Sequence, residues 1–469
     1  MNPHLIRLHQ RRTFLGQACR GVGALALGSL LSQSRAAEPI RGVMSKPHVP
    51  PRAKRVIFIV LAGGASHLEL FDYKPELAKR HGQPMPESIT KGQPIAQLQG
   101  AKLTCFAPQW GFKKHGEAGI EMNELFVHLP KVADDLCVVR SLHTEAINHD
   151  PAHTFMNTGS TVSGRPSMGS WITYGLGSEA DDLPGFVVLT SSRGGQMQPI
   201  ASRQWSSGFL PGRFQGVHLR GKGDPVLYLS NPLGVRTDQQ KDVIDAVQQL
   251  DQFHNTVVDD PEIATRIAQY EMAFKMQSSV PALMDLSGEP VKVLDLYGTR
   301  GADGSFAANC LLARRLAQKG VRFIQLYNRD WDHHGNIKPE IKLKIEEIDR
   351  PLAALIQDLK RLGMFDETLV VVTGEFGRTP MSQGGNGRDH HMKGFSVVLA
   401  GGGIKGGMTY GATDEFGYNA QDKVFPVHDL HATMLHLLGI DHERLTVRFQ
   451  GRDYRLTDVH GRVVKDILA

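Results

Sequence analysis

The sequence is poor in cysteine, and this excludes two kinds of protein. Four cysteines occur in 469 residues, and Cys19 lies in the N-terminal leader. The other three are Cys105, Cys137 and Cys310, an odd number without a close pair. A disulfide framework and a thiolate zinc site are therefore excluded. Any metal must be bound by nitrogen and oxygen atoms.

An excess of positive charge is missing from most of the chain. The formal net charge is +5, but residues 1–37 hold five arginines and no acidic residue. Subtracting these five from the 53 lysines and arginines leaves 48 basic residues against 48 acidic ones. This balance gives no electrostatic reason to expect a nucleic-acid partner or an anionic membrane surface.

The leader has the order of an export signal. The pair Arg11-Arg12 precedes an apolar run at 21–31, and small residues follow it. A membrane span needs about 20 apolar residues, and neither this run nor any later one is that long. We predict a twin-arginine signal over 1–37, a linker over 38–54, and a mature chain in the periplasm or cell envelope without a transmembrane segment.

The rest of the chain alternates between apolar strands and amphipathic helices. The runs typical of strands buried on both faces are 55–61, 136–140, 186–189, 322–327, 369–373 and 395–400. The helical patterns are 306–319, 340–362 and 428–438. The alternation predicts one α/β domain over 55–469, with a mostly parallel sheet and helices on both faces. A loop-rich and then helical insertion interrupts it at about 190–290.

Acidic and histidine side chains gather where the predicted strands end. Ligands of parallel sheets bind beyond the carboxyl ends of the strands, and like charges grouped there are costly unless a cation neutralises them. A single His-His pair is more often a surface or core feature, but two Asp-rich pairs favour a divalent ion, whether zinc, calcium, manganese or magnesium. The candidate ligands are Asp330, Asp332, His334, Glu375, Asp389, His390, His391 and His67.

Two arginines near these ligands are candidates for binding an oxyanion. Arg378 and Arg388 carry guanidinium groups, whose forked geometry matches phosphate or sulfate. The alternative is a salt bridge from each arginine to a nearby acid.

These motifs resemble those of the alkaline phosphatase superfamily, which includes sulfatases and cofactor-independent phosphoglycerate mutases. Asp330 and His334 have the spacing of its Asp-x-x-x-His ligand pair, Glu375 stands where it places an Asp, and His391 matches its last histidine ligand. The chain also resembles a large family of exported, sulfatase-like bacterial proteins of unknown function, through Trp-Asp-x-His, Glu-Phe-Gly-Arg-Thr and Gly-Arg-Asp-His. The resemblance implies an alkaline phosphatase-like three-layer αβα sandwich acting on sulfate or phosphate esters.

The sequence departs from the superfamily pattern at two metal-ligand positions. Gly63-Gly64 occupy the place of the Asp that follows the first strand, where His67 and Glu69 are the possible substitutes. Phe376 occupies the place of a histidine.

A third departure concerns the nucleophile. Pro151, Thr158 and Gly159 fit the sulfatase pattern, but His149 stands where sulfatases have an oxidisable Cys or Ser, and His153 replaces an Arg. Formylglycine cannot form from histidine. His149 is the catalytic candidate, and three roles remain open for it: a metal ligand, a nucleophile that forms a phosphohistidine, or a structural relic.

Two functions remain open at this point. The first is an exported, metal-dependent hydrolase of small-molecule or glycan sulfate or phosphate esters. The alternative is a non-catalytic relative that binds metal or glycan in a cell-surface assembly. The missing nucleophile favours the second function, and the large ligand set favours the first.

Overall fold

The computed structural model describes residues 41–93, 95–192, 195–226, 272, 276–277 and 279–469. The predicted signal over 1–37 and the middle of the predicted insertion, residues 227–271, lie outside the described residues. Among the described residues, no helix has the length and apolarity that a membrane span requires.

A nine-stranded sheet forms the centre of the described part. Its strands, in spatial order, are β12 (Met408–Tyr410), β4 (Leu136–His143), β11 (Phe395–Ala400), β8 (Thr368–Thr373), β1 (Arg55–Leu61), β7 (Phe323–Asn328), β5 (Phe186–Thr190) and β6 (Val217–Arg220), with β15 (Phe425–Pro426) beside β4. All pairings are parallel except those of β11 with β4 and β8. All six predicted strands therefore lie in this sheet.

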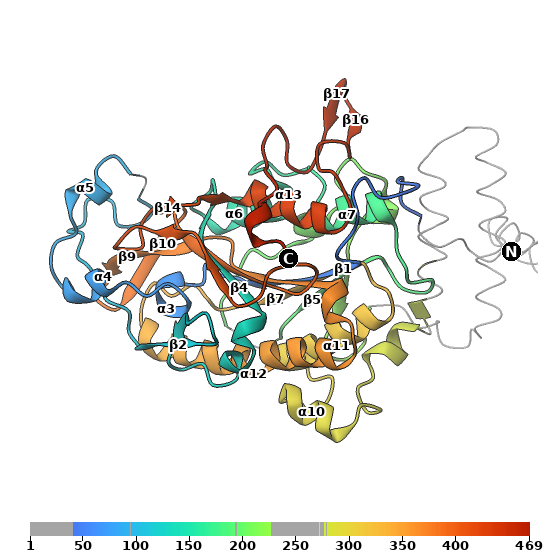
Figure 1. Ribbon diagram of the computed structural model, residues 1–469, viewed down its shortest axis with the longest axis horizontal. Coiled ribbons are helices and arrows are strands. Elements are labelled where there is room, and N and C mark those ends of the chain that lie inside the picture. Colours follow the sequence, from blue (N-terminus) through green and yellow to red (C-terminus); the bar gives the residue numbers. More distant parts are fainter. Residues whose placement is uncertain (1–40, 94, 193–194, 227–271, 273–275, 278) are drawn as a thin grey trace, which may run out of the picture. The chain divides into compact units, whose positions relative to one another are not determined.

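Helices cover both faces of the sheet (Figure 1). One face carries α10 (Val291–Tyr297), α11 (Phe306–Gln318) and α12 (Ile337–Arg361). The other face carries α6 (His149–Thr158), α7 (Met168–Leu176) and α13 (Val427–Leu437). The α/β class and the mostly parallel sheet predicted from the sequence are confirmed.

The side chains of β1 show why this strand is apolar throughout. Ile57, Ile59 and Leu61 belong to the core shared with α11 and α12, and the alternate residues Val56 and Phe58 belong to the core shared with α13. Every residue of the strand is buried. Burying each large apolar side chain contributes about 1.5–3 kcal/mol, so a strand between two helical layers carries no polar face.

The antiparallel direction of β11 follows from its connection to β8. A parallel crossover usually contains a helix, and the connection over 374–394 contains none. Here the chain instead passes through a hairpin of β9 (Gly377–Gln383) and β10 (Gly387–His391) and returns in the opposite direction. The hairpin lies beyond the end of β8, next to the site described below.

Shorter elements complete the described part. The other two-stranded ribbons are β2 (Phe112–His115) with β3 (Ile120–Asn123), β13 (Ala412–Thr413) with β14 (Ala420–Asp422), and β16 (Val447–Phe449) with β17 (Arg452–Tyr454). The short α-helices are α3 (His67–Leu70), α4 (Pro75–Lys79) and α5 (Glu87–Thr90). The 3₁₀ turns are η1 (Leu129–Asp135), η2 (Ser202–Trp205), η3 (Gly212–Phe214), η4 (Phe365–Glu367) and η5 (Lys465–Ile467).

Candidate metal centre

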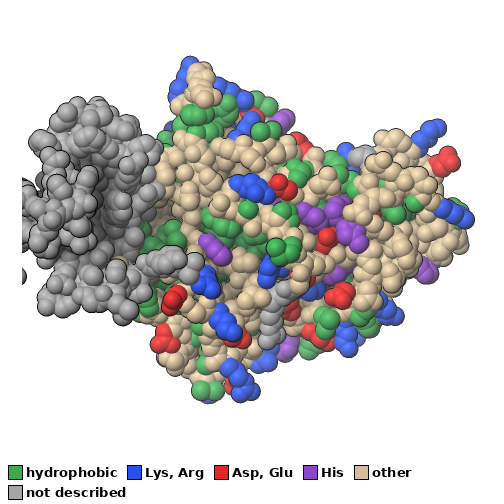
Figure 2. All heavy atoms as spheres, turned by 180° about the vertical axis from the view of Figure 1, so that it is seen from behind, with side chains coloured by type: hydrophobic (Ala, Val, Ile, Leu, Met, Phe, Trp, Pro, Cys, Tyr) green, Lys and Arg blue, Asp and Glu red, His purple; other side chains and the backbone are tan. Residues whose placement is uncertain are grey.

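Four segments bring imidazole and carboxylate groups together at the edge of the sheet where β7 and β8 end. Asp332 and His334 lie in the loop after β7, and His390 lies on β10. His149 is the first residue of α6, and Glu375 lies in the turn after β8. Figure 2 shows histidine side chains gathered with an acidic side chain on one face. The side chains of His334 and Asp332 are 27% and 21% exposed, so the group is open to solvent on one side.

Four of these residues could hold one cation: His149, Asp332, His334 and His390. Nε2 of His334 lies 2.9 Å from Nε2 of His390 and 2.9 Å from Oδ1 of Asp332. The other oxygen of Asp332 lies 3.2 Å from Nε2 of His149. Tetrahedral zinc with bonds of about 2.0–2.1 Å separates its ligand atoms by about 3.3 Å. The observed spacings of 2.9–3.2 Å are close to that separation.

The hydrogen bond made by one ring nitrogen of His390 determines whether the other nitrogen is free to bind a cation. Nδ1 of His390 lies 2.9 Å from the carbonyl oxygen of Ile147, which can only accept a hydrogen bond. Nδ1 of His390 therefore carries the hydrogen, and Nε2 directs a lone pair at Asp332, 3.2 Å away. A lone pair facing a carboxylate is repulsive unless a proton or a cation lies between them. The donor set fits a divalent cation.

The charges of the neighbouring side chains also favour a cation at this position. Burial opposes the charged form of His149, but the neighbouring carboxylates Asp332 and Glu375 raise its pKa to about 9. Burial likewise opposes ionisation of Glu375, but His153 and His149 lower its pKa to about 2. A proton on His149 thus lies between two carboxylates. Metal binding releases such protons, because the ligand must be deprotonated.

A second group of possible ligands shares His149 and consists of His149, His153 and Glu375. Nδ1 of His149 lies 2.7 Å from Oε1 of Glu375, and Nε2 of His153 lies 3.4 Å from the same oxygen. His153 is fully buried, and neither of its ring nitrogens has a hydrogen-bond partner among the described residues. Sequence reasoning left His153 out of the ligand set, although its four-residue step from His149 places both rings on one face of α6.

Two predicted acidic ligands lie outside both groups. The carboxylate of Asp330 accepts hydrogen bonds from the backbone N–H groups of residues 195 and 196, at 3.0 and 2.9 Å. The carboxylate of Asp389 accepts from the backbone N–H groups of residues 97 and 98, at 2.6 and 2.9 Å. Each of these acids holds a loop in place.

Two predicted histidine ligands also lie outside both groups. Nε2 of His67 lies 2.9 Å from the carbonyl oxygen of Gly417, and Nε2 of His391 bonds to that of Tyr418. Both rings are buried, and burial lowers the pKa of each to about 4. Their hydrogen bonds join α3 and β10 to the segment around residue 417.

Arg378 holds a metal-ligand candidate in place. Its guanidinium is fully buried and donates to the carbonyl oxygens of Gly63, Gly64 and Arg388. It also donates to Oδ1 of Asp332. Four of its N–H groups are thereby engaged within the protein, and one of the four bonds orients Asp332.

Arg388 forms the salt bridge that the sequence left as an alternative. Its Nε and Nη2 lie 3.0 and 2.7 Å from Oε1 of Glu69, and both side chains are fully buried. It donates further hydrogen bonds of 3.0 Å to the carbonyl oxygens of Thr379 and Ala107.

Gly63 and Phe376, at which the sequence departs from the pattern that it resembles, both border the centre. The N–H of Gly63 donates to the two oxygens of Glu375 at 3.0 and 3.2 Å. Gly63 has φ +122°, and a Cβ there would lie 2.5 Å from the backbone nitrogen of Asp332. The ring of Phe376 packs 5.0 Å from that of His149 and 4.6 Å from that of His390. The glycine thus lets the backbone of Asp332 lie close to residue 63, and the phenylalanine packs against the two histidine rings.

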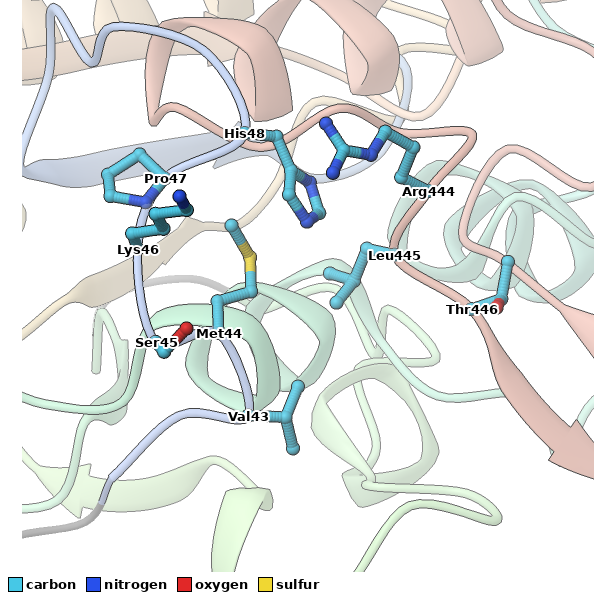
Figure 3. A pocket seen from close by; sticks show the side chains of 9 residues that line it. All are labelled: Val43, Met44, Ser45, Lys46, Pro47, His48, Arg444, Leu445 and Thr446. Atoms are coloured by element: carbon cyan, nitrogen blue, oxygen red, sulfur yellow. The ribbon is translucent and has the colours of Figure 1, made fainter.

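A cavity of about 660 Å³ lies apart from this centre (Figure 3). It is lined by residues 43–48 and 444–446, with Lys46, His48 and Arg444 as the nitrogen-bearing side chains. Its wall forms where the predicted linker meets the domain, since the N–H of His48 donates to the carbonyl oxygen of Gly439. No carboxylate lines it, so it lacks the acidic oxygen ligands that calcium and magnesium prefer.

The mostly parallel sheet and the histidine–carboxylate group at its carboxyl edge define an α/β protein with a candidate metal site. The chain belongs to the family described as "Protein of unknown function (DUF1501)", whose model matches residues 53–468. A comparison with curated proteins found no match.

Several solved structures are similar to the chain. One is the PsFucS1 sulfatase from Pseudoalteromonas sp., with 11% identity, 84% of this chain and 69% of that chain covered, and a TM-score of 0.34. Another is a protein in the alkaline phosphatase superfamily from Vibrio parahaemolyticus, with 10% identity, 95% and 78% covered, and a TM-score of 0.35. A third is the zinc complex of the C-terminal periplasmic domain of EcEptC from Escherichia coli, with 8% identity, 90% and 99% covered, and a TM-score of 0.33.

Proposed function

We propose that the chain is an exported, metal-dependent hydrolase of sulfate or phosphate esters. The observation that carries the proposal is the convergence of His149, Asp332, His334 and His390 at the carboxyl edge of the sheet. A divalent cation bound there would polarise an ester oxygen and lower the pKa of a bound water towards about 7. Such chemistry needs no side-chain nucleophile, which fits a chain with histidine in place of the sulfatase Cys or Ser.

The residues of the chain hold this group in a fixed arrangement. Arg378 donates to Asp332 and keeps its carboxylate directed at the three imidazoles. Glu375 accepts from Nδ1 of His149 and leaves Nε2 of that ring for the cation. In this assignment His149 is a metal ligand and Glu375 orients it.

A specific observation favours the second candidate, a non-catalytic metal- or glycan-binding protein. Arg378 and Arg388 have most of their donors engaged by internal acceptors. Neither guanidinium is therefore available, as placed, to clamp a sulfate or phosphate group.

Two aspartates two residues apart provide a matched test. Asp332→Asn should lose bound zinc, because it removes the carboxylate charge from the ligand group. Asp330→Asn should keep bound zinc, because Asp330 only accepts backbone hydrogen bonds outside the group. Zinc per chain is measured by elemental analysis of the mature protein, and the wild type should carry about one to two ions, as mononuclear and two-metal hydrolase sites do.

The results separate the two functions. Equal zinc content in the two variants, or a metal-free wild type, would contradict the metal site. Zinc-loaded wild type that hydrolyses 4-nitrophenyl sulfate or phosphate supports the hydrolase. Zinc-loaded wild type that cleaves neither ester, nor any in a broad ester panel, supports the binding protein instead. Export rests on the leader over 1–37, and cell fractionation after changing Arg11 and Arg12 to lysine tests it.

A further inference from the structure

Gln383, the last residue of β9, lies between a candidate metal ligand and a neighbouring loop. Its side-chain Oε1 lies 2.6 Å from Nδ1 of His334. Its side-chain Nε2 donates to Oε1 of Gln97 at 2.9 Å. Among the described residues, no other hydrogen bond reaches Nδ1 of His334.

The orientation of this amide decides which nitrogen of His334 faces the cation. An amide oxygen only accepts, so Nδ1 of His334 carries the hydrogen and Nε2 keeps its lone pair. That lone pair points at the group containing Asp332 and His390, both 2.9 Å away. With the amide reversed, its NH₂ would face Nδ1 and stabilise the tautomer whose Nε2 carries the hydrogen and cannot bind metal.

The backbone of Gln97 is hydrogen-bonded to Asp389, which directly precedes the candidate ligand His390. Oδ2 of Asp389 accepts from the N–H groups of Gln97 and Leu98 at 2.6 and 2.9 Å. Oδ1 of Asp389 accepts from the N–H of His390 at 2.8 Å. Hydrogen bonds to a carboxylate are roughly twice as strong as neutral ones. The loop that carries Gln97 is thereby tied to the strand that carries His390.

We propose that Gln383 is a positioning residue for His334, and that Gln97 fixes the orientation of its amide. The inference rests on the proposed metal site and adds to it the residues that set a ligand's tautomer. Removing a partner that orients a metal ligand typically weakens metal binding 10–100-fold.

The test measures the zinc dissociation constant of the mature chain by competition with a chromophoric chelator. Gln383→Ala should raise it about 10–100-fold. Gln383→Glu keeps an acceptor for Nδ1 and should bind zinc within a few-fold of wild type. Gln97→Ala should weaken binding less than Gln383→Ala, because the amide is freed but still present. Gln99→Ala is the control and should bind zinc as wild type does, since among the described residues the side chain of Gln99 donates to the carbonyl oxygen of Ile95, within the same loop.

A second measurement follows the tautomer itself. In zinc-loaded protein with ¹⁵N-labelled histidine, the ring of His334 should show a hydrogen on Nδ1, and Gln97→Ala should make that hydrogen exchange faster with water. The inference is overturned if wild type binds zinc and Gln383→Ala binds it equally well, or if Gln383→Glu is as weak as Gln383→Ala. A hydrogen found on Nε2 of zinc-loaded His334 also overturns it. Failure of the wild type to bind zinc overturns the metal site as well, which distinguishes the two failures.

Discussion

Replacing Arg388 with methionine tests whether this arginine holds the fold together or binds an anion. Arg388 and Glu69 are a fully buried ion pair with contacts of 2.7 and 3.0 Å. Within the described part of the chain, methionine would leave the buried carboxylate of Glu69 with one donor, the N–H of Gln109, 2.9 Å away. It would also leave the carbonyl oxygens of Thr379 and Ala107 without this donor.

The expected loss of stability is large for a single substitution. Removing one partner of a buried ion pair costs about 3–5 kcal/mol, because the remaining charge has no compensation. Arg448 offers a matched control, since its pair with Asp453 is 68% and 56% exposed. Exposed pairs contribute about 0–1 kcal/mol, so Arg448→Met should change stability little.

Urea unfolding of the mature, metal-loaded protein, followed by circular dichroism, measures both variants. Glu69→Gln combined with Arg388→Met should destabilise less than the sum of the single changes, because the pair is coupled. The reasoning is refuted if Arg388→Met unfolds at the wild-type urea midpoint. Wild-type stability together with lost binding of sulfate or vanadate would instead assign Arg388 to the oxyanion role.

Two further predictions concern the backbone at the centre and a histidine outside it. Gly63→Ala should lower zinc content, because the new Cβ would lie 2.5 Å from the backbone nitrogen of Asp332. Gly82→Ala is the control: Gly82 also has a positive φ, but nothing lies within 4 Å of the new Cβ, so this variant should keep its zinc. Equal zinc in the two variants would contradict this. Burial lowers the pKa of His431 to about 3. The unfolded chain therefore binds a proton near pH 6.5 that the folded chain does not bind. The free energy of unfolding falls as the pH drops below 6.5. His431→Gln should remove about 2 kcal/mol of the stability loss between pH 7 and pH 5, measured by urea unfolding at each pH. The prediction is refuted if the free energy of unfolding of this variant falls with pH as steeply as that of wild type.

The sheet could be predicted because its physical requirement appears locally in the sequence. Strands buried on both faces must be apolar at nearly every position, as Val56 to Leu61 are, and such runs are visible without a structure. The hairpin over 377–391 could not be predicted this way. Its residues are polar, and their pairing depends on where β8 ends and β11 begins.

The candidate site was predictable in part. Asp332, His334, Glu375, His390 and His149 were all singled out from the sequence, and all lie in groups that could hold a metal. Their roles remain predictions. The common signal was position, since each follows or precedes a strand at the sheet edge where ligands bind.

By itself, the sequence determined the α/β class, the strands and the neighbourhood of the candidate site, because burial and strand ends are encoded locally. Only the tertiary structure decided between chemically identical side chains. Asp330 and Asp332 are two residues apart, yet backbone N–H groups from residues 195 and 196 reach only Asp330, and three imidazoles surround Asp332. Arg388 faces Glu69, 319 residues away in the chain. Such partners come from distant segments, so no local pattern specifies them.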